Sequence, residues 1–383
     1  MSQKRKIYFQ SVKRIVIKIG SGVLTGDKGL NLGIIRSISM QISNLIDKGM
    51  EVILVSSGAM SAGIRKIGLE CRPEDIPRRQ AVAAIGQAGL IMEYEKGFRR
   101  YQKQVAQILL TSDDLHNRRR YLNARNTLYT LLSWKVVPII NENDTVMVEE
   151  IQFGDNDNLA AMITLLMDAD LLIILTDKEG LYTTDPGENK DAELISFIPE
   201  INSNIEKIAL HNPGVLGTGG MRSKIRAAKK VTSVGIPMII AKGGRRDILN
   251  SLLIGKEYGT FFIPKERKLA SRKCWIAYTL KPRGNIIIDD GAASAILERG
   301  KSLLPSGIIS INGEFDVGAP VEFRNTHNEA LGIGLVNYSS RDISKIRGLK
   351  SKEIINCLGY KPYDEIIHRD NLVITAECAD PCT

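Results

Sequence analysis

The sequence predicts an α/β fold: an open, mainly parallel sheet sandwiched by helices, followed by a small β-rich second domain. Two observations predict it. Over the first 260 residues, strand-length apolar segments alternate with amphipathic helical segments, an order typical of parallel sheets. From Gly284 onward the apolar segments are short and strand-like, with turn residues between them. A chain of 383 residues is long enough for two or three domains, so both parts fit.

The composition, 43% hydrophobic and 25% charged, excludes disorder, collagen and coiled coil for most of the chain. No apolar run approaches the ~18 residues of a membrane span, and no apolar segment follows the basic residues near the N-terminus. We therefore expect a cytoplasmic protein without a membrane partner. The five cysteines are scattered and the four histidines form no ligand pattern, so we expect neither a disulfide framework nor a metal site.

The first strand–helix–strand unit comprises a strand over residues 14–20, a helix over about 32–48 and a strand over 51–55. Apolar residues recur at helical spacing in the middle segment, and Gly49 is a suitable C-cap. The two flanking segments are almost continuously apolar, as in buried parallel strands. This order indicates a βαβ unit.

The same alternation continues to about residue 241. Polar and glycine residues cluster just after several of the predicted strands, which is where open α/β sheets bind ligands. The further helices are expected over about 79–101, 119–133 and 158–167 and after Gly220, and the further strands over 105–110, 136–140, 171–175 and 237–241.

The alternation of strand and helix patterns ends after about Tyr258. We predict a first domain over residues 1–265, a basic linker over 266–282, a second domain over 283–370 and a tail over 371–383. The second domain is expected to hold strands over 285–288, 308–311, 321–323 and 332–337, with a helix over 292–298.

The net charge of +9 is unevenly distributed. Residues 281–370 carry 12 basic and 12 acidic side chains, whereas residues 1–280 carry 40 basic against 29 acidic. An anionic ligand is therefore expected in the first domain. RNA binding by the second domain is not expected, because phosphate contacts normally need a basic face.

Lys18 interrupts an otherwise apolar strand just before a glycine loop. A lysine buried without a partner in a central strand costs several kcal/mol. At the carboxyl end of the strand it can instead meet a bound anion. The alternative is a lysine at the edge of the sheet that reaches solvent.

The glycine-rich stretch at residues 217–224 lacks the Gly-Lys-Ser/Thr ending of a P-loop. Its glycines still expose backbone N–H groups, and the helix that follows directs its positive end to the same place. Lys224, one turn into that helix, can reach a phosphate. The alternative is an ordinary loop with a surface lysine.

Two polar stretches, at residues 141–144 and 154–158, follow a strand and precede a helix respectively. Helix capping and turn chemistry explain some of these side chains but not four in succession. No Ser/His/Asp arrangement is present, which favours a substrate that needs no general base. A carboxylate, already ionised at pH 7, is such a nucleophile.

Taken together and in order, these stretches resemble the amino-acid kinase family. The resemblance covers about residues 12–370, and its second half is similar to a PUA domain. The kinase motifs lie at residues 16–21, 56–59, 122–125, 140–144, 154–159, 176–177 and 217–224, and the PUA motifs at 291–292, 295–297, 300–305 and 307–308.

The resemblance implies ATP-dependent phosphorylation of the glutamate side-chain carboxylate to glutamyl 5-phosphate, the first step of proline biosynthesis, with Mg²⁺ carried on the nucleotide. It implies that Lys18 and Lys224 neutralise the transferring phosphoryl group and that Asp157 holds both lysines. The residues implied for glutamate are Ser57, Asp144 and Asn156. Those implied for ATP are Lys18, Thr176, Asp177, Thr218, Gly219, Gly220, Met221, Arg222, Ser223 and Lys224.

Partners follow from the same resemblance: glutamyl phosphate reductase, and further copies of this chain in a homo-oligomer. Proline shares the α-carboxylate and a charged nitrogen with glutamate, so we expect it to compete through Asp144 and the loop at residues 145–153, which includes Glu150 and Ile151. The alternatives are another amino-acid kinase, such as an acetylglutamate kinase, an aspartokinase or a uridylate kinase, and an RNA-binding PUA protein.

Overall fold

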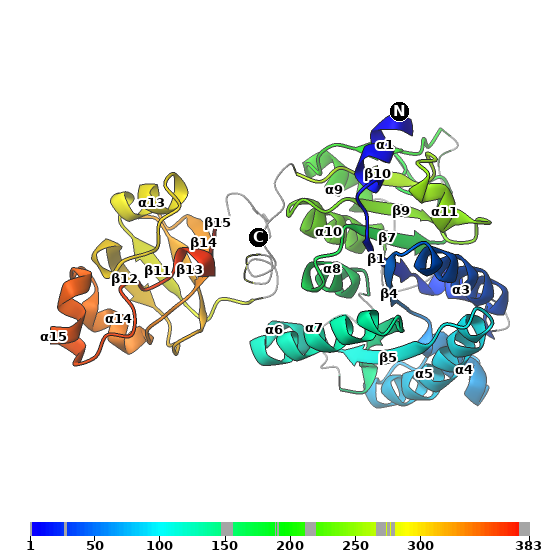
Figure 1. The fold of residues 1–383 in the computed structure, drawn as a ribbon, viewed down its shortest axis with the longest axis horizontal. Coiled ribbons are helices and arrows are strands. Elements are labelled where there is room, and N and C mark those ends of the chain that lie inside the picture. The colour runs from blue at the N-terminus through cyan, green and yellow to red at the C-terminus, as the bar shows by residue number, and fades with distance from the viewer. Residues whose placement is uncertain are drawn as a thin grey trace. The chain divides into compact units, whose positions relative to one another are not determined.

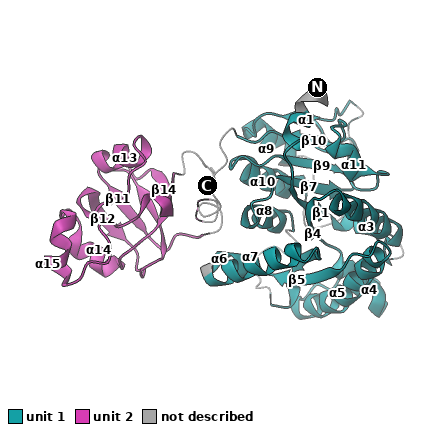
Figure 2. Cartoon of the chain, viewed as in Figure 1, with its two compact units in different colours: residues 1–268 teal, residues 269–383 magenta. Residues whose placement is uncertain are grey.

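The computed structural model describes residues 2–26, 29–146, 156–187, 189, 191–210, 220–265, 273, 276 and 280–374. The chain divides into two compact units, residues 1–268 and residues 269–383 (Figure 2). Each unit has a hydrophobic core of its own.

In the described part of the first unit, a sheet of eight strands has the order β5-β6-β4-β1-β7-β9-β10-β8 (Figure 1). Neighbouring strands are parallel, except that β9 and β10 are antiparallel. The central strands β1, β4 and β7 are almost continuously apolar and buried, as expected where both faces are covered. The strands are β1 (Arg14–Ile19), β4 (Glu51–Val55), β5 (Val105–Leu110), β6 (Val137–Glu142), β7 (Leu171–Thr176), β8 (Phe197–Ile198), β9 (Met238–Lys242) and β10 (Thr260–Phe262), with a separate hairpin of β2 (Thr25–Gly26) and β3 (Gly29–Leu30).

Helices cover both faces of this sheet (Figure 1). On one face α3, α5 and α11 share a core with Ile15, Ile17 and Ile19 of β1. Lys18 alternates with these residues along the strand and so points to the other face, where α8 contacts β1. The helices are α1 (Ser2–Phe9), α2 (Ser21–Leu24), α3 (Leu32–Asp47), α4 (Ala59–Ile67), α5 (Ile76–Arg99), α6 (Ser112–His116), α7 (Arg118–Ser133), α8 (Asn156–Leu166), α9 (Ser203–Leu210), α10 (Met221–Thr232) and α11 (Ile248–Leu253), with a 3₁₀ helix η1 (Asp144–Val146).

The predicted α/β class is confirmed, and the expected strands and helices of the first unit are present within a few residues. α4 was not expected. Its residues, Ala59–Ile67, follow a glycine in the left-handed conformation, Gly58 at φ +96°, and the sequence pattern predicts no element there. α8 begins at Asn156, two residues before its expected start, so three of the polar side chains, Asn156, Asp157 and Asn158, lie in its first turn.

α4 and α5 pack against each other with almost no space between their backbones. A Cβ atom at Gly86 of α5 would lie 1.8 Å from the carbonyl oxygen of Ala59, and one at Gly63 of α4 would lie 1.8 Å from that of Val82. Only glycine fits at these two contacts. α5 is therefore held directly against the segment that follows β4.

Arg5 fixes the N-terminal helix α1 near strands β8 and β10, at one edge of the sheet. Its guanidinium group is almost fully buried, with the residue 2% exposed. It donates to the backbone carbonyl groups of Lys256 at 3.2 Å, Tyr258 at 3.0 Å and Gly259 at 3.3 Å, and to that of Ser196. These four acceptors compensate for the burial of the charge.

The second unit is a small sheet with the strand order β12-β11-β13-β14-β15 and short helices around it. Its core includes the fully buried Phe323 and Tyr338. The four expected strands and the expected helix are present, while α14, α15 and β15 were not expected. The elements are β11 (Asn285–Ile288), α13 (Asp290–Leu297), η2 (Pro305–Gly307), β12 (Ile308–Asn312), β13 (Pro320–Arg324), β14 (Ala330–Leu335), α14 (Ser340–Ile346), η3 (Ser351–Glu353), α15 (Ile354–Leu358), η4 (Arg369–Asn371) and β15 (Leu372–Ile374).

Candidate active site

Two buried lysines share one buried carboxylate at the carboxyl end of the central strands. Lys18 Nζ of β1 lies 2.6 Å from Asp157 Oδ1, and Lys224 Nζ of α10 lies 3.0 Å from Asp157 Oδ2. Asp157 is fully buried in the first turn of α8, and the lysines are 4% and 5% exposed. This trio of charges has one positive charge in excess. It is therefore suited to an anion.

Burial alone would raise the pKa of Asp157. The charges of Lys18 and Lys224, together with hydrogen bonds from Lys18 and Ser223, outweigh that effect and hold the pKa well below its usual range. The carboxylate is thus ionised at neutral pH and orients both ammonium groups.

The start of α10 is tied to the same carboxylate. Ser223 Oγ donates to Asp157 Oδ2 at 2.6 Å, and the N-cap residue Gly220 is extended. Met221 is buried beneath the helix, whereas Arg222 is exposed. The expected ATP-binding residues Thr218 and Gly219 lie outside the described residues. The positive end of α10 is fixed beside the two lysines.

Asn156, the neighbour of Asp157, is held by its amide nitrogen. Nδ2 lies within hydrogen-bond distance of three acceptors: the Ser56 carbonyl oxygen at 2.8 Å, Ser57 Oγ at 2.9 Å and Asn141 Oδ1 at 3.0 Å. The residue is 5% exposed, and its Oδ1 has no hydrogen-bond partner in the part of the chain that the structure describes. A buried acceptor without a partner is costly, and a ligand N–H would satisfy it.

Two buried amides behind Asn156 were not identified from the sequence as functional. Asn141, at the end of β6, donates from Nδ2 to Gln87 Oε1 of α5 at 2.7 Å. Asn141 Oδ1 also accepts from the backbone N–H of Glu142 at 2.9 Å. Asn141 lies in one of the polar stretches, but nothing in the sequence distinguishes Gln87 from the other polar residues of α5.

Asp144 lies in η1, directly after β6, and is partly exposed. Burial of its carboxyl group raises its pKa to about 6, although the charge of Arg72 acts in the opposite direction. A cationic ligand group that paired with Asp144 would lower this pKa again. The loop that follows, including Glu150 and Ile151, lies outside the described residues.

Thr176 and Asp177 follow β7, the neighbour of β1. Thr176 Oγ1 donates to Asp177 Oδ1 at 3.0 Å, and the backbone N–H of Gly20 donates to the carbonyl oxygen of Leu175 at 2.9 Å. A Cβ atom at Gly22 would lie 3.4 Å from the carboxyl carbon of Asp177. Thr176 and Asp177 therefore lie beside the glycine loop after β1.

The structure thus brings several of the expected residues, together with Asn141, into two adjoining clusters. Lys18, Asp157, Ser223 and Lys224 form the charged cluster, and Ser57, Asn156 and Asn141 form the amide cluster. The consecutive residues Asn156 and Asp157 join them. No hydrogen bond or ion pair joins Asp144 to either cluster among the described residues.

Within the described residues, no group of three or more His, Cys, Asp or Glu side chains is arranged to hold a metal ion. None of the helices found there is both long enough and apolar enough to cross a membrane. Cys274, Cys378 and Cys382 lie outside the described residues.

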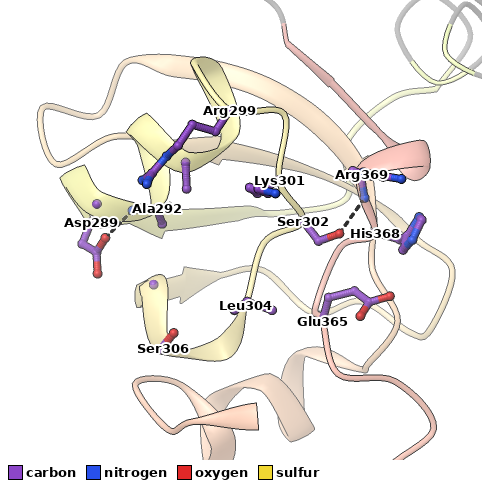
Figure 3. Close-up of a pocket in the computed structure, with 13 residues that line it drawn as sticks. Asp289, Ala292, Arg299, Lys301, Ser302, Leu304, Ser306, Glu365, His368 and Arg369 are labelled. Atoms are coloured by element: carbon purple, nitrogen blue, oxygen red, sulfur yellow. Dashed lines mark hydrogen bonds between the residues drawn. The ribbon is translucent and has the colours of Figure 1, made fainter.

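The second unit has a pocket of about 790 Å³ (Figure 3). Arg299, Lys301 and Arg369 contribute positive charges to its wall, and Asp289 and Glu365 contribute negative ones. All three cations are exposed, unlike the buried Lys18 and Lys224 of the first unit. The two labelled hydrogen bonds in Figure 3 are structural: Asp289 caps α13 at the Ala292 N–H, and Ser302 Oγ accepts from the Arg369 N–H.

Comparison with known proteins gives consistent matches in both units. The amino acid kinase family matches residues 13–242, and the PUA domain matches residues 284–358.

Relatives named glutamate 5-kinase match nearly the whole chain. The protein from Syntrophus aciditrophicus is 50% identical over 374 residues, which cover 98% of this chain and 97% of that protein. The protein from Geobacter sulfurreducens is 51% identical over 364 residues, or 95% and 98% of the two chains. The protein from a Thermoanaerobacter species is 50% identical over 362 residues, or 94% and 97%.

Proposed function

Because the chain belongs to the amino acid kinase family and carries a PUA domain, we propose that it transfers the γ-phosphoryl group of ATP to the side-chain carboxylate of glutamate. The product is glutamyl 5-phosphate, in the first step of proline biosynthesis. The observation that carries the proposal is the charged cluster: two buried lysines on one buried carboxylate, next to a buried amide oxygen that needs a donor.

In this reaction a carboxylate oxygen of glutamate attacks the γ-phosphorus, and the bond from that phosphorus to the β–γ bridging oxygen breaks. ADP leaves, and no proton has to be removed from the nucleophile. The protein therefore has to position two anions and stabilise the negative charge that they share. Lys18 and Lys224 supply the positive charge that does this, and Asp157 holds them in a fixed geometry.

Glutamate is assigned to the amide cluster. Asn156 and Ser57 face it with polar atoms, and Asp144 receives its ammonium group. The unpaired Oδ1 of Asn156 supports this assignment, because it can accept an N–H group.

ATP is assigned to Thr176, Asp177 and the segment from Thr218 to Lys224. The fixed N-terminus of α10 suits a phosphate group, because its N–H groups point outward and its dipole favours negative charge. Mg²⁺ enters on the nucleotide, where it neutralises phosphate charge.

A panel of phosphoryl acceptors, three carboxylates and UMP, tests the proposal. Each substrate is incubated with MgATP, and hydroxylamine traps any acyl phosphate as a hydroxamate. Glutamate should give the largest kcat/KM, while N-acetylglutamate, aspartate and UMP should react poorly. The reaction of UMP gives no acyl phosphate and is measured by the release of ADP. A preference for any of these three would mean that the chain has another activity of the family.

Proline is proposed as a feedback inhibitor that competes with glutamate at Asp144. Proline should raise the apparent KM for glutamate without lowering kcat, and substitution of Glu150 or Ile151 should weaken proline more than glutamate. A coupling of about 1–3 kcal/mol, or 5–150-fold, is ordinary for such regulation. An unchanged apparent KM at millimolar proline would refute competition.

We further propose that the enzyme is cytoplasmic and forms a homo-oligomer. Its product is proposed to pass to glutamyl phosphate reductase, because an acyl phosphate hydrolyses readily in water. The first domain is proposed to end at residue 265 and the second to begin at residue 283. The expected tail from residue 371 starts too early, because β15 (Leu372–Ile374) pairs with β14 of the second unit. RNA is not assigned as a partner, since the second domain has no net charge.

A further inference from the structure

The orientation of the Asn156 amide is decided by a chain of hydrogen bonds that leads away from the site. The Ser56 carbonyl oxygen can only accept, so the side of the Asn156 amide that faces it has to be nitrogen. Oδ1 is then directed to the opposite side, where it has no partner among the described residues. If this amide were turned over, an oxygen would face the Ser56 carbonyl oxygen and Asn141 Oδ1, neither of which can donate, and a substrate would meet N–H groups instead of an acceptor.

Asn141 has a fixed orientation for a similar reason. The backbone N–H of Glu142 requires an acceptor, so Asn141 Oδ1 faces it and is also available to Asn156 Nδ2. Asn141 Nδ2 then points the other way, towards α5. It donates to Gln87 Oε1 at 2.7 Å, which is the shortest hydrogen bond in this series of amides.

Gln87 is well placed to serve as a fixed end of this chain. It is 9% exposed, and its neighbour Gly86 packs against the Ala59 carbonyl oxygen with no space for a Cβ atom. Ala59 follows Ser57 by only two residues. The backbone contact and the three amides therefore form a closed ring through β4, α8, β6 and α5.

From this ring we infer that Gln87 is a positioning residue for the carboxylate substrate: through Asn141, it keeps Asn156 Oδ1 directed into the site. The inference rests on the proposed function, because Asn156 is assigned to glutamate there. Gln87 itself touches neither substrate.

Replacement of Gln87 by methionine tests the inference. Methionine keeps the length and the helix preference of glutamine but removes the oxygen acceptor, so a buried N–H of Asn141 loses its partner. The KM for glutamate should rise about fivefold or more, the range expected from loss of one buried hydrogen bond, while the KM for ATP stays unchanged. Gln87→Glu keeps an oxygen acceptor in either protonation state and should restore the KM for glutamate.

Tyr94→Phe provides the matched control. Tyr94 lies two turns further along α5, and its buried hydroxyl bonds to Ser56 Oγ at 3.0 Å, on the same loop but outside the amide chain. Its loss should lower the melting temperature without changing the KM for glutamate. If Gln87→Met also lowers only the melting temperature, Gln87 is merely structural and the inference fails.

A double variant identifies the route. In an Asn156→Ala background, Gln87→Met should have no further effect on the KM for glutamate, whereas an independent effect would multiply. A full additional effect would overturn the route through Asn156. If the substrate panel identifies another carboxylate, the same variants are measured with that substrate, so failure of the proposed function remains distinguishable from failure of this inference.

Discussion

The two units hold their charged side chains in opposite ways. In the first unit, Lys18 and Lys224 are buried and bound to one carboxylate. In the second, Arg299 and Lys301 line an open pocket as exposed side chains. A buried, oriented charge requires no reorganisation when charge develops on a substrate, whereas an exposed one remains mobile and solvated. The contrast teaches that exposed basic residues in a pocket are a weaker sign of catalysis than a few buried basic residues held in a fixed arrangement.

Removal of either buried lysine should have the largest effect. Lys18→Ala and Lys224→Ala should each lower kcat about 10²–10³-fold, which is the ~2.7–4 kcal/mol typical of losing one preorganised group. Steady-state rates measure this, and thermal unfolding shows that the fold persists. Lys229→Ala is the control, because Lys229 lies on the same helix but pairs with Glu206 at 2.9 Å. Near-normal turnover in either site variant would remove that lysine from the mechanism.

Asp144 should make glutamate use sensitive to pH. Its pKa of about 6 means that the ionised form that pairs with an ammonium group is lost as the pH falls through 6. The kcat/KM for glutamate should then fall about tenfold per pH unit below that value. Asp144→Asn should be weak at every pH and show no such break, and a wild-type profile that is flat from pH 7 to 5 would contradict the assignment.

The same pKa fixes the sign of a stability effect. Burial raises the pKa of Asp144 above its unfolded value, so this group destabilises the fold at pH 7 and ceases to do so as the pH falls from about 6 towards 4. Asp157 has the opposite sign. Its lowered pKa gives stability that is present above the unfolded pKa and is lost as the pH falls below about 4.

Deletion of the second unit should have a smaller effect. A chain that ends before Lys281 retains every residue assigned to the reaction, so its kcat/KM for glutamate should fall by less than about tenfold, or ~1.4 kcal/mol. Size-exclusion chromatography and circular dichroism establish that the shortened protein is folded. Complete loss of activity in a folded, soluble truncation would mean that the second unit completes the site.

Neutralising the pocket of the second unit should have the smallest effect. Arg299→Ala and Lys301→Ala alter exposed side chains, and such changes usually stay within about ±0.5 kcal/mol in stability. Melting temperature and kcat/KM should therefore match the unaltered protein. A large fall in kcat/KM would end the contrast between the two units.

The sequence identified the lysines but not the support behind them. Lys18 was recognisable because a charged residue interrupts an apolar strand, and Lys224 because it follows a run of glycines. The partnership of Asp157 with both lysines was expected only from the family resemblance, since residues 18, 157 and 224 meet only through the fold. Roles in catalysis stay predictions for all three.

Gln87 could not be identified because α5 packs on two sides and contains many alanine and glycine residues, which obscure its helical periodicity. α4 was missed for a related reason. Its packing against α5 depends on glycines at two backbone contacts, and a glycine inside a helix normally lowers its propensity. In both cases a tertiary contact decides the structure, and no local pattern reports it.

The buried position of Arg5 also affects the order in which the first unit can be assembled. Its carbonyl acceptors lie between 191 and 254 residues further along the chain. At about 5–20 residues per second, synthesis reaches the last of them ~10–50 s after Arg5 has been made. Until then its set of four acceptors is incomplete. Complete docking of α1 is thus confined to a late stage of folding, after β9 and the segment that leads to β10 have been synthesised.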